Sequence, residues 1–546
     1  MKKRALVLFT LLLFLFSGII LQVYNLSDGL FTEAADSQGT VTVTVANSRG
    51  TIYDTYLNPL VNAGEEYRMS VVPGPETIAA LSQQLDSEAL ADLTERLQSG
   101  RPAVVTVEEP IALEGAALFS VPVRYSGRLL APHLLGYLDS DGLHGVTGVE
   151  QAFDEYLNRC GGKATVTYSV DAMGRPLQGF TPVIENTLDK ATAGVVLTLD
   201  MEIQKLAQEA LEEFVTRGAA VVMEPSTGHI LAMASTPDFQ PDTVADCLND
   251  ESSPLLNRAL CNYNLGSVFK IASTAAALEA GVSTSTRFTC SGAVSVGGVT
   301  FHCHNRLGHG TLDLLGGFTE SCNPYFIQLM QQVGGRRLYD MGVSLGFDRS
   351  LILAEGIKTA RAVLPSLAEL EAPAALANLS FGQGSLLGSP VHVAQMVAAV
   401  VNGGKVVKPT ILKGYRQGNG AGEGEAIAPP QTAFSASTAS TLRELMIKTV
   451  EEGTGEPAMP TVSAGLAGGK TGTAETGWEG GEKAVVQSWF GGFYPAEEPR
   501  YVISIVAEDS DNTGSKSSPV FKKLCEDLYR LEKTRATWLH TDAQEE

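Results

Sequence analysis

Residues 264–273 read NLGSVFKIAS and place a serine three positions before a lysine inside an otherwise apolar run. On a helix, residues i and i+3 lie on one face with their Cβ atoms about 5–6 Å apart. We therefore expect Ser267 and Lys270 to point toward the same place. An amine among apolar neighbours loses hydration and basicity, so it can stay neutral and take a proton from a hydroxyl.

Two further motifs follow in chain order, and the three together decide the fold. FTESCNPYF contains Ser321, Cys322 and Asn323, and GGKTGTAE contains the run 470–473. The order S-x-x-K, S-x-N, K-T-G is that of penicillin-binding proteins and serine β-lactamases. A second S-x-N, at 510–512, follows K-T-G at the end of a predicted strand, where a turn is the better interpretation.

The first two motifs suit acyl transfer by a serine. Ser267 is predicted to be the nucleophile and Lys270 its base, since desolvation or a nearby cation can lower the pKa of a lysine toward neutrality. Ser321 can pass a proton between the amine and the leaving group, and Asn323 can hold an amide of the substrate. The helix N-terminus under Ser267 would direct backbone N–H groups toward a developing oxyanion.

The third motif suits a substrate carboxylate. Its residues are predicted to bind substrate: Lys470, Thr471, Gly472 and Thr473. The backbone N–H of Thr473 is expected to join the oxyanion donors. Each motif alone has a structural explanation, as a cap with a snorkelling lysine, a turn or an edge strand. Their occurrence together, in order on a helix, a loop and a strand, favours the catalytic interpretation.

The surrounding pattern predicts a single α+β domain over 195–535. Asp200 is expected to cap an amphipathic helix that ends near Gly218, and AAVVME and HILAMAS then form a hairpin. A helix-rich stretch runs from about 255 to 460 before a strand at KTGTAE, a hairpin of VVQSWFGGFY and RYVISIVAE, and a last helix. This order predicts an antiparallel sheet flanked by helices, with a helical subdomain inserted.

Length and charge limit the remaining possibilities. The chain has 546 residues, enough for two to four domains. Its formal net charge of −22 repels phosphate backbones, so we expect no nucleic-acid partner. From about 36 to 190, strand-like and helical pieces alternate without a catalytic cluster, which predicts a separate N-terminal α/β module.

The N-terminus predicts a membrane anchor. Three cations precede about 20 largely apolar residues, long enough to cross a bilayer. We expect residues 1–4 to be cytoplasmic, 5–24 to span the membrane, and the rest to face outward. A cleaved signal peptide, with Ala34 and Ala35 near the cleavage point, is the alternative. The apolar run is longer than a usual signal sequence, which favours the retained single-pass anchor.

The chain has seven cysteines, an odd number, so they cannot all pair with one another. The stretch FHCHNRLGHG raises the possibility of zinc, with these candidate ligands: Cys290, His302, Cys303, His304 and His309. Their spacing is not that of a zinc finger. A disulfide between Cys290 and Cys303, or two free thiols, is therefore favoured over zinc.

At these motifs the chain resembles the class B penicillin-binding proteins, which are monofunctional peptidoglycan D,D-transpeptidases. RGTIYDTYLNPLV at 49–61, GVTGVEQAFDEYL, LTLDMEIQKLAQEAL and LSFGQGSLLGSPVHVAQ also look like segments of that family. Cys290, Cys303 and SCNPYF are similar to the branch with the sporulation and elongation enzymes of Gram-positive bacteria. The resemblance covers most of residues 40–530.

The resemblance implies a fold, a reaction and partners. We expect the serine β-lactamase/penicillin-binding transpeptidase fold above an N-terminal pedestal. Ser267 would attack the penultimate D-Ala of a peptidoglycan stem peptide, expel the terminal D-Ala, and pass the acyl group to a neighbouring amine. β-Lactams would acylate the same serine, and a lipid-linked glycan polymerase is expected as a partner. The resemblance implies neither a metal nor an organic cofactor. A serine β-lactamase and a β-lactam-sensing receptor are the alternatives.

Overall fold

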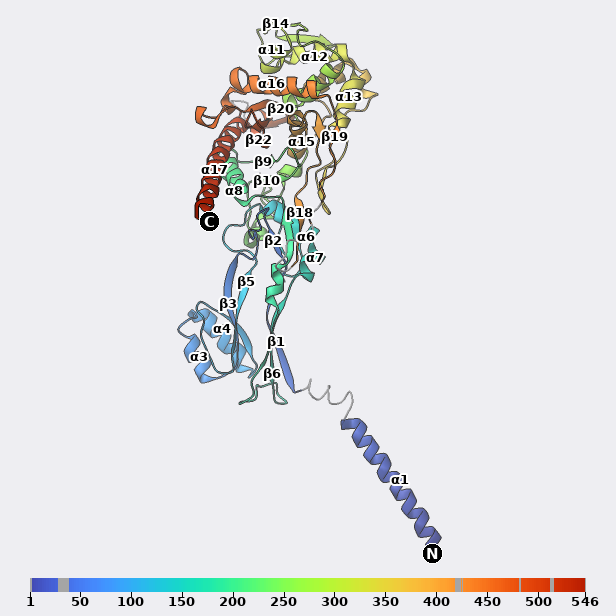
Figure 1. The fold of residues 1–546 in the computed structure, drawn as a ribbon, viewed down its shortest axis with the longest axis vertical. Helices are drawn as coiled ribbons and strands as arrows, with labels where there is room; N and C mark the ends of the chain where they lie inside the picture. Colours follow the sequence, from blue (N-terminus) through green and yellow to red (C-terminus); the bar gives the residue numbers. More distant parts are fainter. Residues whose placement is uncertain are drawn as a thin grey trace. The chain divides into compact units, whose positions relative to one another are not determined.

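The computed structural model describes residues 2–27, 39–417, 424, 426–480, 483–510 and 515–545. Two compact units divide the chain (Figure 1). The first contains Met1–Thr51, Asn62–Ser126 and Asn158–Ala193, and the second contains Ile52–Val61, Gly127–Leu157 and Gly194–Glu546. The expected module at 36–190 is therefore interrupted twice by segments that pack with the second unit.

The reason for the first interruption lies in a small sheet. Strand β2 (Thr51–Tyr53) joins β8 (Gly194–Leu197) and β18 (Leu412–Arg416) in the order β18-β8-β2. The Asp54 carboxylate then accepts hydrogen bonds from the backbone N–H groups of Tyr56, Asn58 and Met201. The bond from Met201 attaches the 52–61 segment to the beginning of the 194–546 part of the second unit.

The N-terminal helix α1 (Lys2–Ser27) contains one apolar stretch. Leu6–Tyr24 is 19 residues long, has a mean hydropathy of 2.6, and has no buried residue. By length and composition it could cross a membrane. A signal sequence near an N-terminus would have the same properties.

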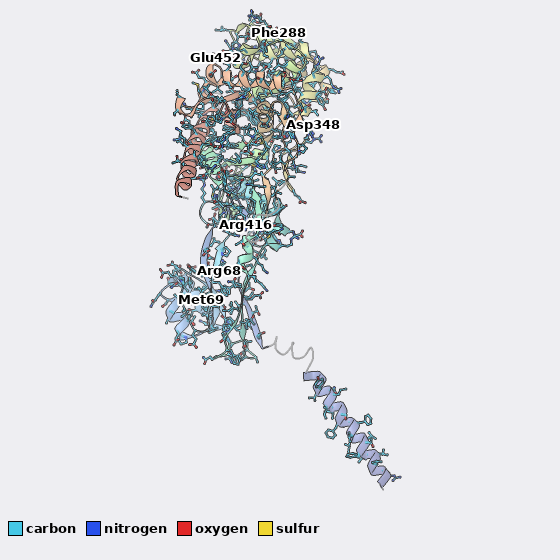
Figure 2. The ribbon with its side chains drawn as sticks, viewed as in Figure 1. Arg68, Met69, Phe288, Asp348, Arg416 and Glu452 are labelled. Atoms are coloured by element: carbon cyan, nitrogen blue, oxygen red, sulfur yellow. The ribbon has the colours of Figure 1, made fainter. Side chains whose placement is uncertain are left out.

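The first unit contains two antiparallel three-stranded sheets. One has the order β1-β6-β7, and the other β4-β3-β5. Alternation places neighbours on opposite faces, so Met69 is 1% exposed while Arg68 pairs with Glu66 at the surface (Figure 2). The elements of this unit are β1 (Thr40–Asn47), β3 (Gly64–Val71), α3 (Pro75–Leu81), α4 (Ser87–Gln98), β4 (Ala103–Val107), β5 (Ala117–Val123), β6 (Lys163–Ser169) and β7 (Val183–Asn186).

The second unit is built on a five-stranded antiparallel sheet of order β10-β9-β22-β21-β20. Early and late segments of the chain meet in it, as expected for an α+β domain. The expected hairpins form, and β20 carries KTGTAE at one edge of the sheet. The strands are β9 (Gly218–Met223), β10 (Ile230–Thr236), β20 (Gly468–Gly480), β21 (Lys483–Tyr494) and β22 (Tyr501–Ser510).

Helices cover both faces of this sheet. A Cβ on Gly492 would meet Phe521 of α17 (Ser517–Glu545) at 2.7 Å, and a Cβ on Gly491 would meet Val393 of α15 (Pro390–Val401) at 2.9 Å. Consecutive residues of a strand face opposite sides, so these two glycines admit one helix on each face. Figure 1 shows α17 beside α8 (Met201–Phe214). Helix α8 starts after its predicted cap Asp200 but ends before the expected Gly218, because Val215 is extended.

A helical subdomain lies between the early and late strands in sequence. Its main helices are α10 (Lys270–Glu279), α11 (Leu314–Thr319), α12 (Asn323–Val333), α13 (Gly335–Ser344), α14 (Pro373–Ser380) and α16 (Ala436–Glu452). It also holds two short two-stranded antiparallel sheets, formed by β11 (Phe288–Cys290) with β14 (Gly310–Leu312) and by β12 (Ala293–Val296) with β13 (Val299–His302). The remaining short elements are α5 (Pro132–Leu135), α6 (Gly148–Ala152), α7 (Asp154–Arg159), α9 (Val244–Cys247), β15 (Ile352–Ala354), β16 (Ile357–Lys358), β17 (Lys405–Val406) and β19 (Gln431–Thr432).

Candidate active site

Ser267 lies in a tight turn that leads directly into helix α10. Residues Gly266–Phe269 form a 3₁₀ turn, and α10 begins at Lys270. Gly266 has φ +58°, and a Cβ at this position would meet the Thr473 carbonyl oxygen at 2.5 Å. Only glycine fits both the backbone conformation and the close approach. The fold thus places the S-x-x-K turn directly against the K-T-G strand.

A second turn holds the same segment from another side. The Gly266 N–H donates to the Gly382 carbonyl at 2.8 Å, and a Cβ on Gly382 would meet the Gly266 carbonyl oxygen at 1.9 Å. On β20, a Cβ on Gly472 would meet Val268 at 3.1 Å. The backbone around Ser267 is therefore fixed between β20 and the turn at Gly382.

Lys270 is fully buried and has three oxygen partners. Its Nζ lies 2.7 Å from the Ser321 carbonyl, 3.2 Å from Ser321 Oγ and 2.7 Å from Asn323 Oδ1. Burial lowers the pKa of Lys270 to about 7, against the opposing effect of the Cys322 and Cys303 thiols. A pKa of about 7 gives the amine a substantial neutral fraction at physiological pH, the form that a base for Ser267 would need.

Ser321 joins the two buried lysines. Its Oγ lies 3.2 Å from Lys270 Nζ and 2.9 Å from Lys470 Nζ. Ser321 also has φ +51°, a conformation that non-glycine residues adopt rarely and at a cost of about 1–3 kcal/mol. Such strain is often found at functional sites, and here it directs one hydroxyl between two amines.

Lys470 is as deeply buried as Lys270. Burial, and then the positive charge of Lys270, place its pKa well below the usual value. Its Nζ also lies 3.2 Å from the Thr471 carbonyl, and Thr471 Oγ1 lies 2.9 Å from Thr454 Oγ1. Thr473, two residues after Thr471 on β20, is exposed. The strand therefore presents a hydroxyl outward while it holds its lysine inside.

The structure brings together five of the predicted site residues in one hydrogen-bonded network: Lys270, Ser321, Asn323, Lys470 and Thr471. Ser267, half-buried, and Thr473 are linked to this network through the backbone contact at Gly266. Within the described part of the chain, no hydrogen bond joins the Ser267 hydroxyl to Lys270, whose amine is directed at Ser321 and Asn323. Catalytic hydrogen bonds are often long before substrate binds.

Several supporting residues were not identified from sequence. Trp489 Nε1 donates to the Asn264 carbonyl at 2.8 Å, which anchors the segment before Ser267 to β21. Gly382 lies in the segment LSFGQG, which was noted only as resembling a family segment. Its role depends on a contact with Gly266, more than 100 positions away, and no local sequence pattern indicates such a contact.

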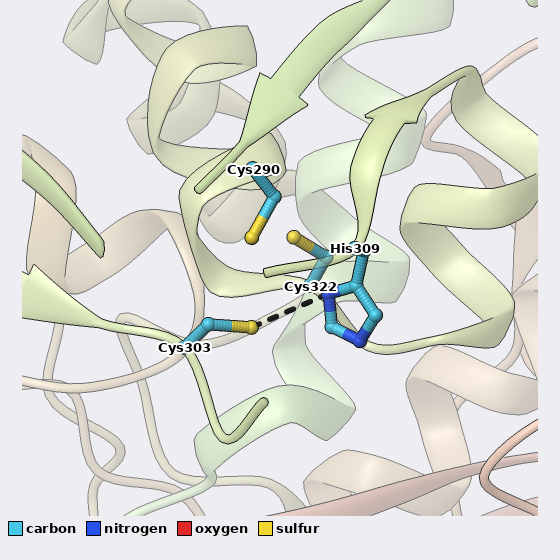
Figure 3. A group of neighbouring side chains, drawn as sticks. All are labelled: Cys290, Cys303, His309 and Cys322. Atoms are coloured by element: carbon cyan, nitrogen blue, oxygen red, sulfur yellow. Dashed lines mark hydrogen bonds between the residues drawn. The ribbon is translucent and has the colours of Figure 1, made fainter. Parts of the chain in front are cut away.

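One cluster next to the site could hold a metal. Ligand atoms of Cys290, Cys303, His309 and Cys322 all lie within 4.8 Å of one another (Figure 3). The cysteines of the structure are free thiols, so the expected alternative of a Cys290–Cys303 disulfide is not formed in it. The predicted zinc set also changes: His302 and His304 are exposed, and Cys322 from the S-x-N motif takes their place.

Known proteins are similar to this chain in sequence. Residues 218–526 match the family model described as the penicillin binding protein transpeptidase domain. The chain is 31% identical to Stage V sporulation protein D of Bacillus subtilis over 415 residues, which cover 72% of this chain and 62% of that protein. It is 28% identical to peptidoglycan D,D-transpeptidase PbpA of Mycolicibacterium smegmatis, covering 74% of this chain and 86% of the relative.

Solved structures give the same result for the fold. The D,D-transpeptidase domain of a peptidoglycan glycosyltransferase from Eggerthella lenta aligns with a TM-score of 0.63 and 26% identity, covering 89% of this chain and 99% of that one. Penicillin binding protein 3 of Mycobacterium tuberculosis, complexed with aztreonam, aligns with a TM-score of 0.65 and 25% identity, covering 90% and 97%.

Proposed function

The chain belongs to the penicillin-binding protein transpeptidase family, and from this premise we propose that it is a peptidoglycan D,D-transpeptidase with Ser267 as its acylated residue. The observation that carries the proposal is the buried pair Lys270 and Lys470 around one hydroxyl, Ser321, next to the turn that holds Ser267. Relatives that the chain matches are named peptidoglycan D,D-transpeptidases, and β-lactam complexes of a similarly folded protein are known.

The proposed acylation step starts from a neutral Lys270. Its amine takes the proton of Ser267 as Oγ bonds to the carbonyl carbon of the penultimate D-Ala. The C–N bond to the terminal D-Ala then breaks, and Ser321 passes a proton from the paired amines to the leaving nitrogen. An amine of a second stem peptide then attacks the acyl-enzyme carbonyl, the ester bond to Ser267 breaks, and the amide bond of the cross-link forms. The amine gives up its proton and Ser267 Oγ takes one back through the same groups. The β-lactam reaction stops at the acyl-enzyme.

Binding of the donor is proposed for β20. This strand ends the order of the described sheet, so its free edge can receive an extended peptide. An incoming carboxylate near Thr471 and Thr473 would favour the charged form of Lys470, because an opposite charge offsets the burial that lowers its pKa. Asn323 would bind the substrate amide. The backbone N–H groups of Ser267 and Thr473 would donate to the oxyanion that forms during acyl transfer.

Cross-linking by the full-length protein in detergent tests this proposal. With a synthetic stem peptide as donor and an amino acid amine as acceptor, we expect D-Ala release and a cross-linked product, both abolished in Ser267→Ala. Glu369→Gln, at an exposed carboxylate outside the site that accepts a hydrogen bond from the Ser366 hydroxyl, is the control and should retain both. Rapid nitrocefin turnover without a cross-linked product would identify a β-lactamase and contradict the proposal.

We also propose the topology and domain roles expected from sequence. Residues 1–4 would be cytoplasmic, 5–24 the single-pass anchor, 36–190 the main part of a pedestal, and 195–535 the outward-facing transpeptidase domain. The unburied apolar stretch Leu6–Tyr24 supports the anchor. A lipid-linked glycan polymerase is the proposed partner, to be tested by crosslinking in membranes. Protease treatment of intact cells should remove the domain, and its resistance there would contradict this topology.

A further inference from the structure

Four side chains beside the proposed active site converge on one point. Cys290, Cys303 and Cys322 are each at most 2% exposed, and the His309 side chain is 8% exposed. Figure 3 shows the sulfur atoms of the three thiols and the imidazole of His309 directed toward a common centre. The S-x-x-K, S-x-N and K-T-G chemistry uses none of these four groups, so their convergence needs a separate explanation.

The local fold explains how residues far apart in sequence meet here. Strand β14 begins directly after His309 and pairs with β11, which ends at Cys290. The Cys303 N–H donates to the Gly292 carbonyl at 2.9 Å, and this bond holds Cys303 near Cys290. Gly308 has φ +85°, and a Cβ there would meet the Cys290 carbonyl oxygen at 2.4 Å. Glycine at this position lets the chain reach His309 without a clash.

The distances suit a tetrahedral zinc ion. Zinc binds sulfur at about 2.3 Å and imidazole nitrogen at about 2.0–2.1 Å, so tetrahedral ligands lie about 3.6 Å (S···N) and about 3.8 Å (S···S) apart. Cys303 Sγ lies 3.5 Å from His309 Nδ1, and all four ligand atoms lie within 4.8 Å of one another. A contraction of about 1 Å at most would complete the site.

The chemistry of the ligands selects zinc over hard cations. Three thiols and one imidazole form a Cys₃His set, which is typical of structural zinc and unsuited to magnesium or calcium. The other ring nitrogen of His309, Nε2, lies 3.8 Å from the Glu320 carboxylate. A carboxylate behind a histidine ligand fixes the tautomer and raises the basicity of the ligating nitrogen.

We propose that Cys290, Cys303, His309 and Cys322 bind one structural zinc ion. Three S–H protons leave to solvent, three Zn–S bonds and one Zn–N bond form, and nothing is oxidised or reduced. The resulting centre carries a net charge of about −1, from three thiolates and one dication. For this cluster the proposal departs from the expectation that the chain holds no metal.

The zinc ion would act on the active site through Cys322, a consequence that rests on the proposed function. Cys322 lies between Ser321 and Asn323, both of which contact Lys270 Nζ. Fixing the Cys322 sulfur would hold the strained φ of +51° at Ser321 and the side chain of Asn323 against the amine. Cys322 is thus a positioning residue for the acylation machinery.

Zinc content of the full-length chain, purified in detergent without added metal or chelator, tests the proposal. We expect one zinc per chain by elemental analysis, and near-complete loss in Cys303→Ser. Cys247→Ser, at a half-buried free cysteine outside the cluster, is the matched control and should keep its zinc. Wild-type protein without stoichiometric zinc, a disulfide among the three cysteines, or zinc unchanged in Cys303→Ser would overturn the proposal.

A milder variant keeps the test valid if Cys303→Ser does not fold. Glu320→Gln retains all four ligands at a half-exposed position and should weaken zinc affinity about 10–100-fold, measured by competition with a chromophoric chelator. Unchanged affinity would contradict the geometry assigned to His309.

Removal and return of zinc test the positioning role of Cys322. In the zinc-free protein, the acylation rate constant for a β-lactam should fall while its initial non-covalent affinity holds, and added zinc should restore the rate. An unchanged rate would overturn the positioning role. A protein that holds zinc but is never acylated would instead overturn the proposed function.

Discussion

The pH dependence of acylation tests the state of Lys270. Burial lowers the pKa of this amine to about 7, so the neutral form increases as the pH rises through that value. If the neutral amine is the base, the acylation rate should follow its fraction, about one-tenth at pH 6 and about nine-tenths at pH 8. Because the pKa of Lys470 is also lowered and the two amines interact, the measured midpoint belongs to the pair.

The size of the change distinguishes a buried base from an ordinary lysine. With a pKa of about 7, the rate rises about tenfold from pH 6 to pH 8 and then levels off. A lysine at its usual 10.5 would give about a hundredfold rise over the same range, without a plateau.

Single-turnover acylation by a fluorescent penicillin, chosen so that it does not titrate in this range, gives the rate at each pH. Thermal melting at each pH would show that the fold is intact. A rate that rises in proportion to hydroxide beyond pH 8, or that is flat from pH 6 upward, would refute the assignment of Lys270 as a neutral base.

Two further predictions concern the same site, and a third concerns the buried ion pair of Arg258 with Glu508 in the same unit. Ser321→Ala removes the hydroxyl shared by the two amines and should lower the acylation rate about 10²–10³-fold, with melting temperature as the control. Gly266→Ala should lower the free energy of unfolding by at least about 1 kcal/mol more than Gly281→Ala, measured by urea titration. Both glycines have positive φ, but only a Cβ on Gly266 would meet backbone atoms of β20. Equal losses in the two variants would contradict this contact. Glu508→Gln leaves the buried Arg258 without its anionic partner and should lower the free energy of unfolding by about 3–5 kcal/mol in the same titration. A loss below about 1 kcal/mol would show that the Ser252 and Ser253 carbonyls are enough to stabilise the buried guanidinium.

Much of the catalytic unit could be predicted because its signals are local. The cap Asp200, the hairpin of β9 and β10 and the late hairpin of β21 and β22 are each specified by neighbouring residues. The three motifs also named the network of Lys270, Ser321 and Lys470, because order and element type restrict where such motifs can meet.

What sequence could not supply depends on contacts between distant segments. Gly266 and Gly382 contact each other across more than 100 residues, and neither position stands out among the 56 glycines of the chain. Cys322 was read only as the middle of S-x-N, since nothing local indicates that its sulfur faces Cys290 and Cys303. The N-terminal module was predicted as continuous because pairing of β2 with β8 involves residues about 140 positions apart.

The most direct test of the central claim is to locate the β-lactam adduct. Full-length protein acylated with penicillin, digested and analysed by mass spectrometry, should carry one penicilloyl group on the peptide that contains Ser267. The same analysis of Ser267→Ala should find no adduct. An adduct on another serine, Ser321 included, or labelling that persists in Ser267→Ala, would contradict the account.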